Sequence, residues 1–124
     1  MKSVRAIIAA FLCAIPLGAY GDEMTCTYQW TGKTQNHPIL IEVTGNSATI
    51  RGGLLNPEFR VIENSSSELV IVQTNTRANS GRNYPVGASL IVVDRVTGRM
   101  VRSNTHTDTS FNSHAVGQCS RITR

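Results

Sequence analysis

Short segments in which every second residue is apolar recur along most of the chain, and this pattern constrains its fold more than any other feature. In the clearest segment the apolar residues, each separated by a polar one, are Met24, Cys26, Tyr28 and Trp30. An alternation with a period of two turns one apolar face inward, as in a half-buried β-strand. Beyond residues 6–17, no stretch of ten or more residues shows the 3.6-residue period and the capping residues of a helix. We therefore expect an all-β fold with almost no helix.

Seven further segments are predicted as strands. They cover residues 39–44, 48–51, 59–62, 69–72, 88–93, 99–102 and 115–120. The run 88–93 is continuously apolar, which is typical of a strand that is buried on both faces or crosses the core. Residues 74–85 lack an apolar period and form the longest predicted loop. The run 103–112 is polar throughout, and His37 is interpreted as a loop residue. Seven or eight short strands, spaced by about ten residues, predict a small antiparallel barrel or sandwich.

The first 21 residues have the features of a cleavable secretion signal. Lys2 and Arg5 precede an apolar stretch, residues 6–17, that is too short to span a bilayer as a helix. Small residues before Gly21 suit a signal peptidase, so we place the cut after Gly21. Residues 22–124 then form a single predicted domain with no lipid anchor and no second long apolar segment. We expect a periplasmic or extracellular product.

Two cysteines, Cys26 and Cys119, remain near the two ends of the predicted domain. Disulfides persist in the compartments to which a secretion signal leads, so we expect these two residues to be bonded. The chain-entropy model assigns such a bridge about 4–5 kcal/mol of stabilisation. A reactive thiol or a metal-binding pair is the alternative, although no histidine stands at a metal-ligand spacing from either cysteine.

The charge and the aromatic content exclude some classes of partner. Because Lys2 and Arg5 belong to the signal, residues 22–124 hold 10 Lys and Arg against 8 Asp and Glu, which is weak support for a polyanion. The few aromatic residues are not interleaved with arginines, so the stacking platform of a nucleic-acid binder is missing. Gly52 and Gly53 are not followed by the lysine of a phosphate-binding loop. We predict no nucleic-acid partner and no cofactor.

A polar segment near the C-terminus contains residue types that catalysis uses. His106, Asp108 and Ser110 fall two apart and would share one face of an extended segment. Strand neighbours two apart stand side by side about 6–7 Å from each other, whereas a triad needs its base between the nucleophile and the orienting carboxylate. A metal site made by His106, Asp108 and His114 lacks the tight spacing of known metal motifs. We therefore predict neither a catalytic centre nor a metal site.

Residues 80–84, Ser-Gly-Arg-Asn-Tyr, stand in the predicted loop ahead of the apolar run. This segment is similar to the Ser-Gly-x-x-Tyr segment of the bacterial periplasmic C-type lysozyme inhibitors. The resemblance implies a small secreted antiparallel β-barrel with a cysteine near each end, in which two loops insert a serine and a basic side chain into the lysozyme cleft. On that analogy the inserted residues are Ser80 and Arg95. The second motif of the family, Phe-Trp-x-Lys-Gly, is absent, and Val-Val-Asp-Arg at residues 92–95 stands in its region.

These observations lead us to expect a non-enzymatic secreted β-barrel that binds a protein or a cell-envelope component, with a lysozyme inhibitor as the sharpest version. The binding surface would come from the loop of residues 75–85 and the hairpin turn of residues 94–98. The candidate binding residues are Ser80, Arg82, Tyr84, Arg95 and Arg99. A small-ligand carrier with an apolar barrel interior is one alternative, and a hydrolase that uses the polar tail is another. A carrier needs a cavity of several hundred Å³, whereas a filled core favours surface binding.

Overall fold

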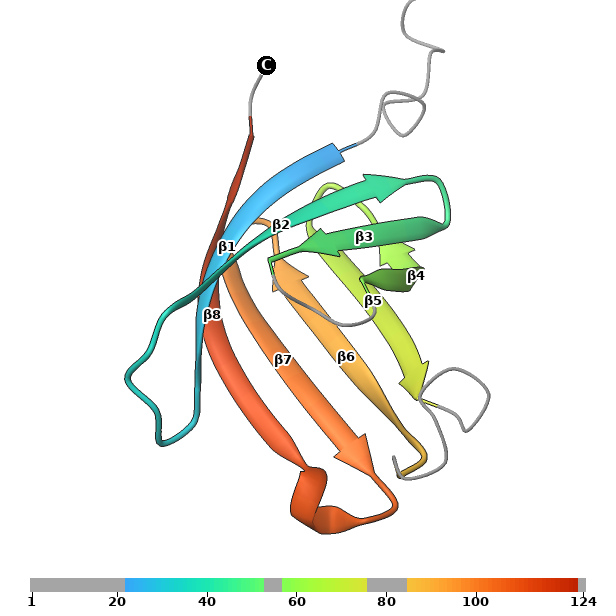
Figure 1. The fold of residues 1–124 in the computed structure, drawn as a ribbon. Coiled ribbons are helices and arrows are strands. Elements are labelled where there is room, and N and C mark those ends of the chain that lie inside the picture. Colours follow the sequence, from blue (N-terminus) through green and yellow to red (C-terminus); the bar gives the residue numbers. More distant parts are fainter. Residues whose placement is uncertain (1–21, 53–56, 76–84, 123–124) are drawn as a thin grey trace, which may run out of the picture.

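The computed structural model describes residues 22–52, 57–75 and 85–122, which form a closed barrel of eight antiparallel strands (Figure 1). The strands are β1 (Asp22–Trp30), β2 (His37–Thr44), β3 (Ser47–Arg51), β4 (Glu58–Asn64), β5 (Glu68–Asn75), β6 (Gly87–Asp94), β7 (Arg99–His106) and β8 (Ser113–Arg121). One short turn of 3-10 helix, η2 (Thr109–Phe111), stands between β7 and β8. The predicted all-β class is confirmed, and of the two architectures considered the chain adopts the barrel.

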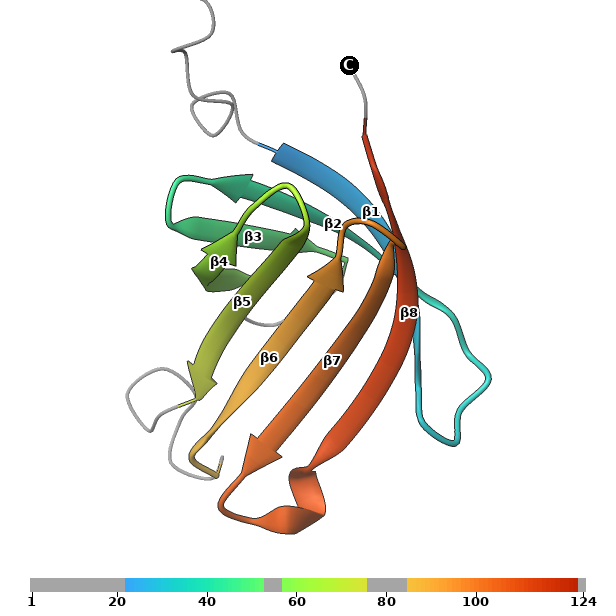
Figure 2. The same ribbon diagram turned by 180° about the vertical axis from the view of Figure 1, so that it is seen from behind.

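Each strand pairs with its sequence neighbour, and the pairing of β1 with β8 closes the barrel. Figure 2 shows the wall made by β5, β6, β7 and β8 from outside. Cys26 and Cys119 face each other in the register of the closing pair, and their sulfur atoms are 2.03 Å apart in a disulfide. The predicted bridge is thus present, and it joins the first strand to the last across the seam that closes the barrel.

The connections between strands gather at two ends of the barrel. At the first, which we call the terminus end, the start of β1 and the end of β8 lie beside the turns of residues 65–67 and 95–98 (Figure 1). At the second, which we call the hollow end, β1 stops at Trp30 and β7 stops at His106. Strands run between these ends, so a loop and a hairpin turn that follow each other along the chain lie at opposite ends.

Alternating side chains fill the interior, and their chemistry changes along the barrel axis. The most completely buried large side chains are Ile41, Val43, Ile50, Leu69, Ile71, Ile91, Val93 and Met100. Towards the hollow end, the buried polar side chains are Ser89, Arg102 and His106. The interior therefore has an apolar part and, near the hollow end, a polar part.

Within the described residues, no helix has the length and apolar character that crossing a membrane requires.

Three sequence-based interpretations are wrong in detail. The apolar run of β6 is buried on one face only, because Leu90 and Val92 are 39% and 37% exposed on the outside of the barrel. His37 belongs to β2 and not to a loop, and its ring stacks on Tyr28 with the centroids 5.3 Å apart. β7 continues to His106 through the segment that reads as a polar run. The barrel interior accepts polar residues there, so no apolar alternation marks the strand.

Candidate functional site

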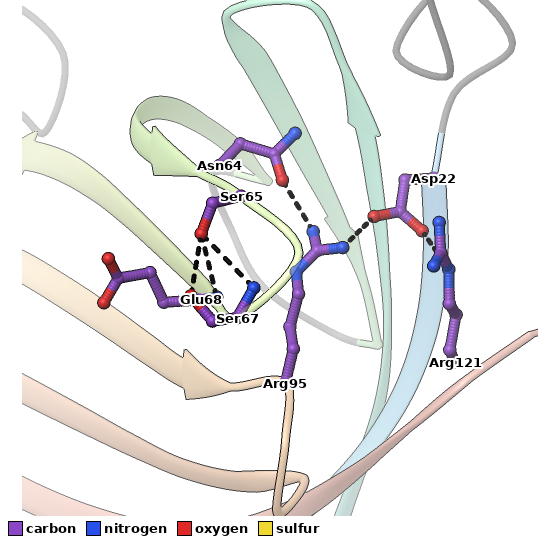
Figure 3. A network of polar contacts seen from close by, with 7 residues as sticks. All are labelled: Asp22, Asn64, Ser65, Ser67, Glu68, Arg95 and Arg121. Carbon is purple, nitrogen blue, oxygen red and sulfur yellow. Dashed lines mark hydrogen bonds and ion pairs between the residues drawn. The ribbon is translucent and has the colours of Figure 1, made fainter. Parts of the chain in front are cut away.

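The terminus end carries an ion-pair network around Arg95 (Figure 3). The Nη1 atom of Arg95 lies 2.6 Å from Oδ2 of Asp22, and its Nη2 atom donates a hydrogen bond of 2.7 Å to Oδ1 of Asn64. Oδ1 of Asp22 is also 3.1 Å from Nε of Arg121. The side chains of Arg95 and Asp22 are only 11% and 10% exposed. Arg95 thus links the β6–β7 turn to β1 and β4, and its charge is neutralised within the barrel.

The β6–β7 turn that contains Arg95 and the neighbouring β4–β5 turn are each held by hydrogen bonds to their own side chains. Oγ of Ser65 accepts hydrogen bonds from the backbone N–H groups of Ser67 and Glu68 at 3.3 and 3.2 Å, as Figure 3 shows. Oδ1 of Asp94 accepts from the backbone N–H groups of Val96 and Thr97 at 2.9 and 3.2 Å. These two hydrogen bonds, that from Thr97 first, lower the pKa of Asp94. Arg95 is therefore presented on a well-braced turn.

Of the predicted binding residues, the structure describes Arg95 and Arg99. Ser80, Arg82 and Tyr84 lie outside the described residues. The strands that flank them, β5 and β6, meet at the Asn75–Gly87 pair at the hollow end, whereas Arg95 follows the other end of β6. An eight-residue strand separates its two ends by roughly 23 Å. Arg99 begins β7 with an exposed side chain.

The hollow end carries an open depression with a volume of about 700 Å³, which we call the hollow. It is lined by Trp30, Thr31, Lys33, Ser103, Asn104, Thr105, Asn112, Ser113 and His114. The indole ring of Trp30, the imidazole ring of His114, several hydroxyl and amide groups and one lysine make up this lining. No carboxylate stands among these described lining residues, so the hollow is suited to a polar or negatively charged group.

Arg102 lies in the barrel interior near the hollow and is 6% exposed. Its guanidinium carbon stands 5.8 Å from the ring centroid of Tyr28 and 5.4 Å from that of Trp30. Its Nη1 atom donates a hydrogen bond of 3.1 Å to the Tyr28 hydroxyl, while its buried Nε has no acceptor. Within the described part of the chain, no carboxylate lies within ion-pair distance of it. Arg102 is a buried cation whose hydrogen-bonding capacity is only partly used.

Glycine makes room for the aromatic part of this arrangement. Gly117 on β8 faces Tyr28 on β1 in the register of the closing pair. A Cβ atom at Gly117 would lie 2.3 Å from the carbonyl oxygen of Thr27 and 2.7 Å from Cβ of Tyr28. Any side chain at this position would displace β1, so glycine lets Tyr28 occupy the interior next to Arg102.

Two further inward polar groups near Arg102 also have unused hydrogen-bonding capacity. Within the described part of the chain, Oγ of Ser89, a residue only 3% exposed, has no hydrogen-bond partner, and neither has the buried Oδ1 of Asn104. Ser89 and Asn104 are opposite each other on β6 and β7, and Asn104 also donates a hydrogen bond of 2.9 Å to Oγ of Ser113. Buried polar groups are normally paired with protein, water or a bound group, so these two atoms can take part in further hydrogen bonds.

The tail residues that carry catalytic chemistry in principle have structural roles here. Asp108 accepts hydrogen bonds from the hydroxyl and the backbone N–H of Ser110 at 2.7 and 3.1 Å and thereby caps η2. These bonds, that from the hydroxyl first, lower the pKa of Asp108. The His106 side chain is buried, and its ring packs against Phe111 with centroids 6.0 Å apart. In residues 22–52, 57–75 and 85–122, no three His, Cys, Asp or Glu residues form a group that could hold a metal ion.

Sequence reasoning did not select Arg102, Tyr28 or Trp30 as site residues. A usable signal was present, since Arg102 stands two residues after the buried Met100 and so has the inward phase of β7. An arginine in phase with apolar core residues indicates a buried charge.

Comparisons of the chain with protein-family models, with curated proteins and with solved structures found no match.

Proposed function

We propose that this protein is a non-enzymatic binding module that holds a protein or a cell-envelope component of the periplasm or extracellular space in the hollow. The main support for this proposal is the size and position of the depressions in the barrel. The apolar interior is filled by side chains, and the smaller pocket beside Met24, Val93 and Cys119 measures only about 100 Å³. A carrier of small apolar ligands needs several hundred Å³ of enclosed space. Of the two depressions lined by described residues, the hollow is the larger, and it is open and lined mainly by polar residues, which supports recognition at the surface.

The side chains of the tail support the non-enzymatic part of this proposal. Asp108 and Ser110 bond to each other within the η2 cap, and His106 points into the barrel beside Phe111. A nucleophile that is activated by a base needs the two groups within hydrogen-bond reach, with the base oriented by a third group. The contacts of these residues instead stabilise the link between β7 and β8.

Capture experiments with one matched pair of variants test the use of the hollow. Lys33 lines the hollow, whereas Arg60 is exposed on the outside of β4. The purified protein is immobilised and exposed to periplasmic extract and to host fluid, and bound material is identified and its affinity measured. Lys33→Glu should weaken the capture of the identified partner about tenfold, while Arg60→Glu, with the same change of charge, leaves it unchanged. Equal effects of the two variants would contradict binding in the hollow.

The lysozyme-inhibitor version of this proposal has a separate test. Arg95 is engaged with Asp22 and Asn64, so its insertion into an enzyme cleft would require that network to break. The measurement is the rate of bacterial cell-wall lysis by a C-type lysozyme with the purified protein at micromolar concentration. Inhibition that is weakened by Ser80→Ala would support this version. Lysis at the normal rate would remove it and leave binding in the hollow as the proposal.

A further inference from the structure

The polar part of the barrel interior contains a positive charge that has no counter-ion among the residues that the structure describes. Arg102 is the only lysine or arginine among the buried residues that the structure describes. It is held by the Tyr28 hydroxyl and by two aromatic rings, which stabilise a cation but neutralise no charge. A buried charge is normally paired because removal from water disfavours it. A negatively charged group beside Arg102 would therefore be favoured.

The hollow offers such a group a way to Arg102. Trp30 lines the hollow, and its ring also lies against the Arg102 guanidinium. Asn104 likewise lines the hollow, and it stands two residues beyond Arg102 on the inward phase of β7. Ser89 is opposite Asn104 and hence diagonal to Arg102, a relation that puts Cα atoms about 7–8 Å apart. A ligand group that passes Trp30 from the hollow would meet Arg102 and the unpaired Ser89 hydroxyl together.

The donor set fits a carboxylate better than a phosphate. The planar guanidinium fork matches the two oxygens of a carboxylate, and its Nε and remaining Nη hydrogens are the donors still available. One buried arginine supplies one positive charge, which one carboxylate neutralises. A phosphate monoester carries about −1.5 to −2 at neutral pH and would bury excess negative charge there.

We infer that Arg102 is the recognition residue for a carboxylate that a protein partner presents from the hollow, with Trp30 at the entrance. This inference rests on the proposed function, and it adds the chemical group that the hollow selects. The partner's carboxylate would accept from Nε and Nη of Arg102 and from the Ser89 hydroxyl. Trp30 is the only tryptophan of the chain, so its signal reports on this one place.

A titration followed by nuclear magnetic resonance and fluorescence tests this inference with defined probes. Sodium propionate serves as the model of a glutamate side chain, and propionamide and sodium chloride serve as controls. Propionate should shift the Arg102 Nε–H resonance and the Trp30 signals saturably in the millimolar range, because an acceptor then reaches Nε. Neither control should do so. Absence of a saturable shift with propionate would overturn the inference.

Variants separate recognition by Arg102 from general attraction to a positive protein. Arg102→Met, which replaces the cation by an apolar chain, should raise the half-saturating propionate concentration at least about tenfold. Arg60→Met removes an exposed arginine from the outside of β4 and should leave that concentration unchanged. Arg102→Lys keeps the charge without the fork and is measured as well, in case Arg102→Met fails to fold. Binding of propionate that is unaffected by both Arg102 variants would place the carboxylate elsewhere and refute the inference.

Two peptides distinguish a partner's side chain from a free small acid. A short peptide with one glutamate and an amidated C-terminus should shift the same resonances as propionate, and its glutamine counterpart should not. If propionate binds while the glutamate peptide does not, the protein-partner form of the inference is wrong and the site is one for free acids. Failure of partner capture with intact peptide binding would remove only the proposed function. Capture that depends on Lys33 but not on Arg102 would remove only this inference.

Discussion

The two ends of the barrel each hold a nearly buried arginine, and they differ in how the charge is balanced. At the terminus end, Arg95 has a carboxylate of Asp22 at 2.6 Å and an amide oxygen of Asn64 at 2.7 Å. At the hollow end, Arg102 has the Tyr28 hydroxyl and two aromatic rings. The buried Nε atoms of both arginines have no acceptor among the described residues, so the counter-ion is what separates them. An arginine whose charge is balanced by a carboxylate of its own chain serves the fold. An arginine without such a carboxylate, beside an open depression, can serve recognition instead.

The largest expected effect concerns the disulfide that fastens the closing strand pair. Replacing Cys26 and Cys119 by serine should lower the free energy of unfolding by about 2–5 kcal/mol, because the bridge restricts the unfolded chain. Denaturant unfolding of the variant and of the oxidised protein measures the difference. Intact-mass analysis after alkylation provides the control, since the parent protein should have no alkylated cysteine at these two positions. An unchanged unfolding midpoint would show that pairing of β1 with β8 suffices to close the barrel.

The second expected effect tests whether the Arg95 pair is structural. Asp22→Asn should cost about 3 kcal/mol of unfolding free energy, because the Arg95 guanidinium would remain nearly buried without its counter-ion. The matched control is Arg121→Ala, which removes the 59% exposed partner of the same carboxylate and should cost about 0.5 kcal/mol or less. Chemical denaturation at neutral pH gives both values. Equal losses of unfolding free energy in the two variants would contradict the special weight given to the Asp22–Arg95 pair.

The third expected effect sharpens the contrast between the two arginines. Arg102→Met should change the unfolding free energy by no more than about 1 kcal/mol, since an apolar chain of similar length relieves the burial of an incompletely paired charge. Arg95→Met should cost more than that, because Asp22 loses its nearly buried partner. Denaturation curves of the two variants side by side decide the matter. A loss at Arg102 as large as that at Arg95 would assign both arginines to stability.

The smallest expected effect is a loss of thermal stability at acidic pH to which an aspartate at each end of the barrel contributes. Hydrogen bonds from backbone and hydroxyl groups lower the pKa of Asp94 at the terminus end and of Asp108 at the hollow end. A lowered folded-state pKa gives stability that is present above the unfolded pKa of about 4 and is lost as the pH falls through the folded value. Asp94→Asn and Asp108→Asn should each reduce the loss of thermal stability in this acidic range. Glu63→Gln, on an exposed position of β4, is the control.

The sequence predicted the strands best where apolar residues alternate with polar ones. In β1 the inward phase of Met24, Cys26 and Tyr28 is the buried phase of the structure. Prediction failed where an inward position is polar, as along the end of β7, because Arg102 and His106 interrupt the apolar signal. The candidate site around Arg102 could not be predicted for the same reason. A buried arginine contributes no apolar periodicity, and its neighbours come from β1, β6 and β7.

The sequence by itself determined the local features of this protein: strands of period two, turns rich in Gly, Asn and Ser, and two cysteines able to pair. These properties depend on backbone preferences and on neighbours along the chain. Only the tertiary structure decided that the sheet closes into a barrel, because closure needs the pairing of β1 with β8, whose register partners Cys26 and Cys119 are 93 positions apart. It also decided that Arg95 meets Asp22 while Arg102 faces aromatic rings. Those contacts join residues distant in sequence, and no local pattern encodes them.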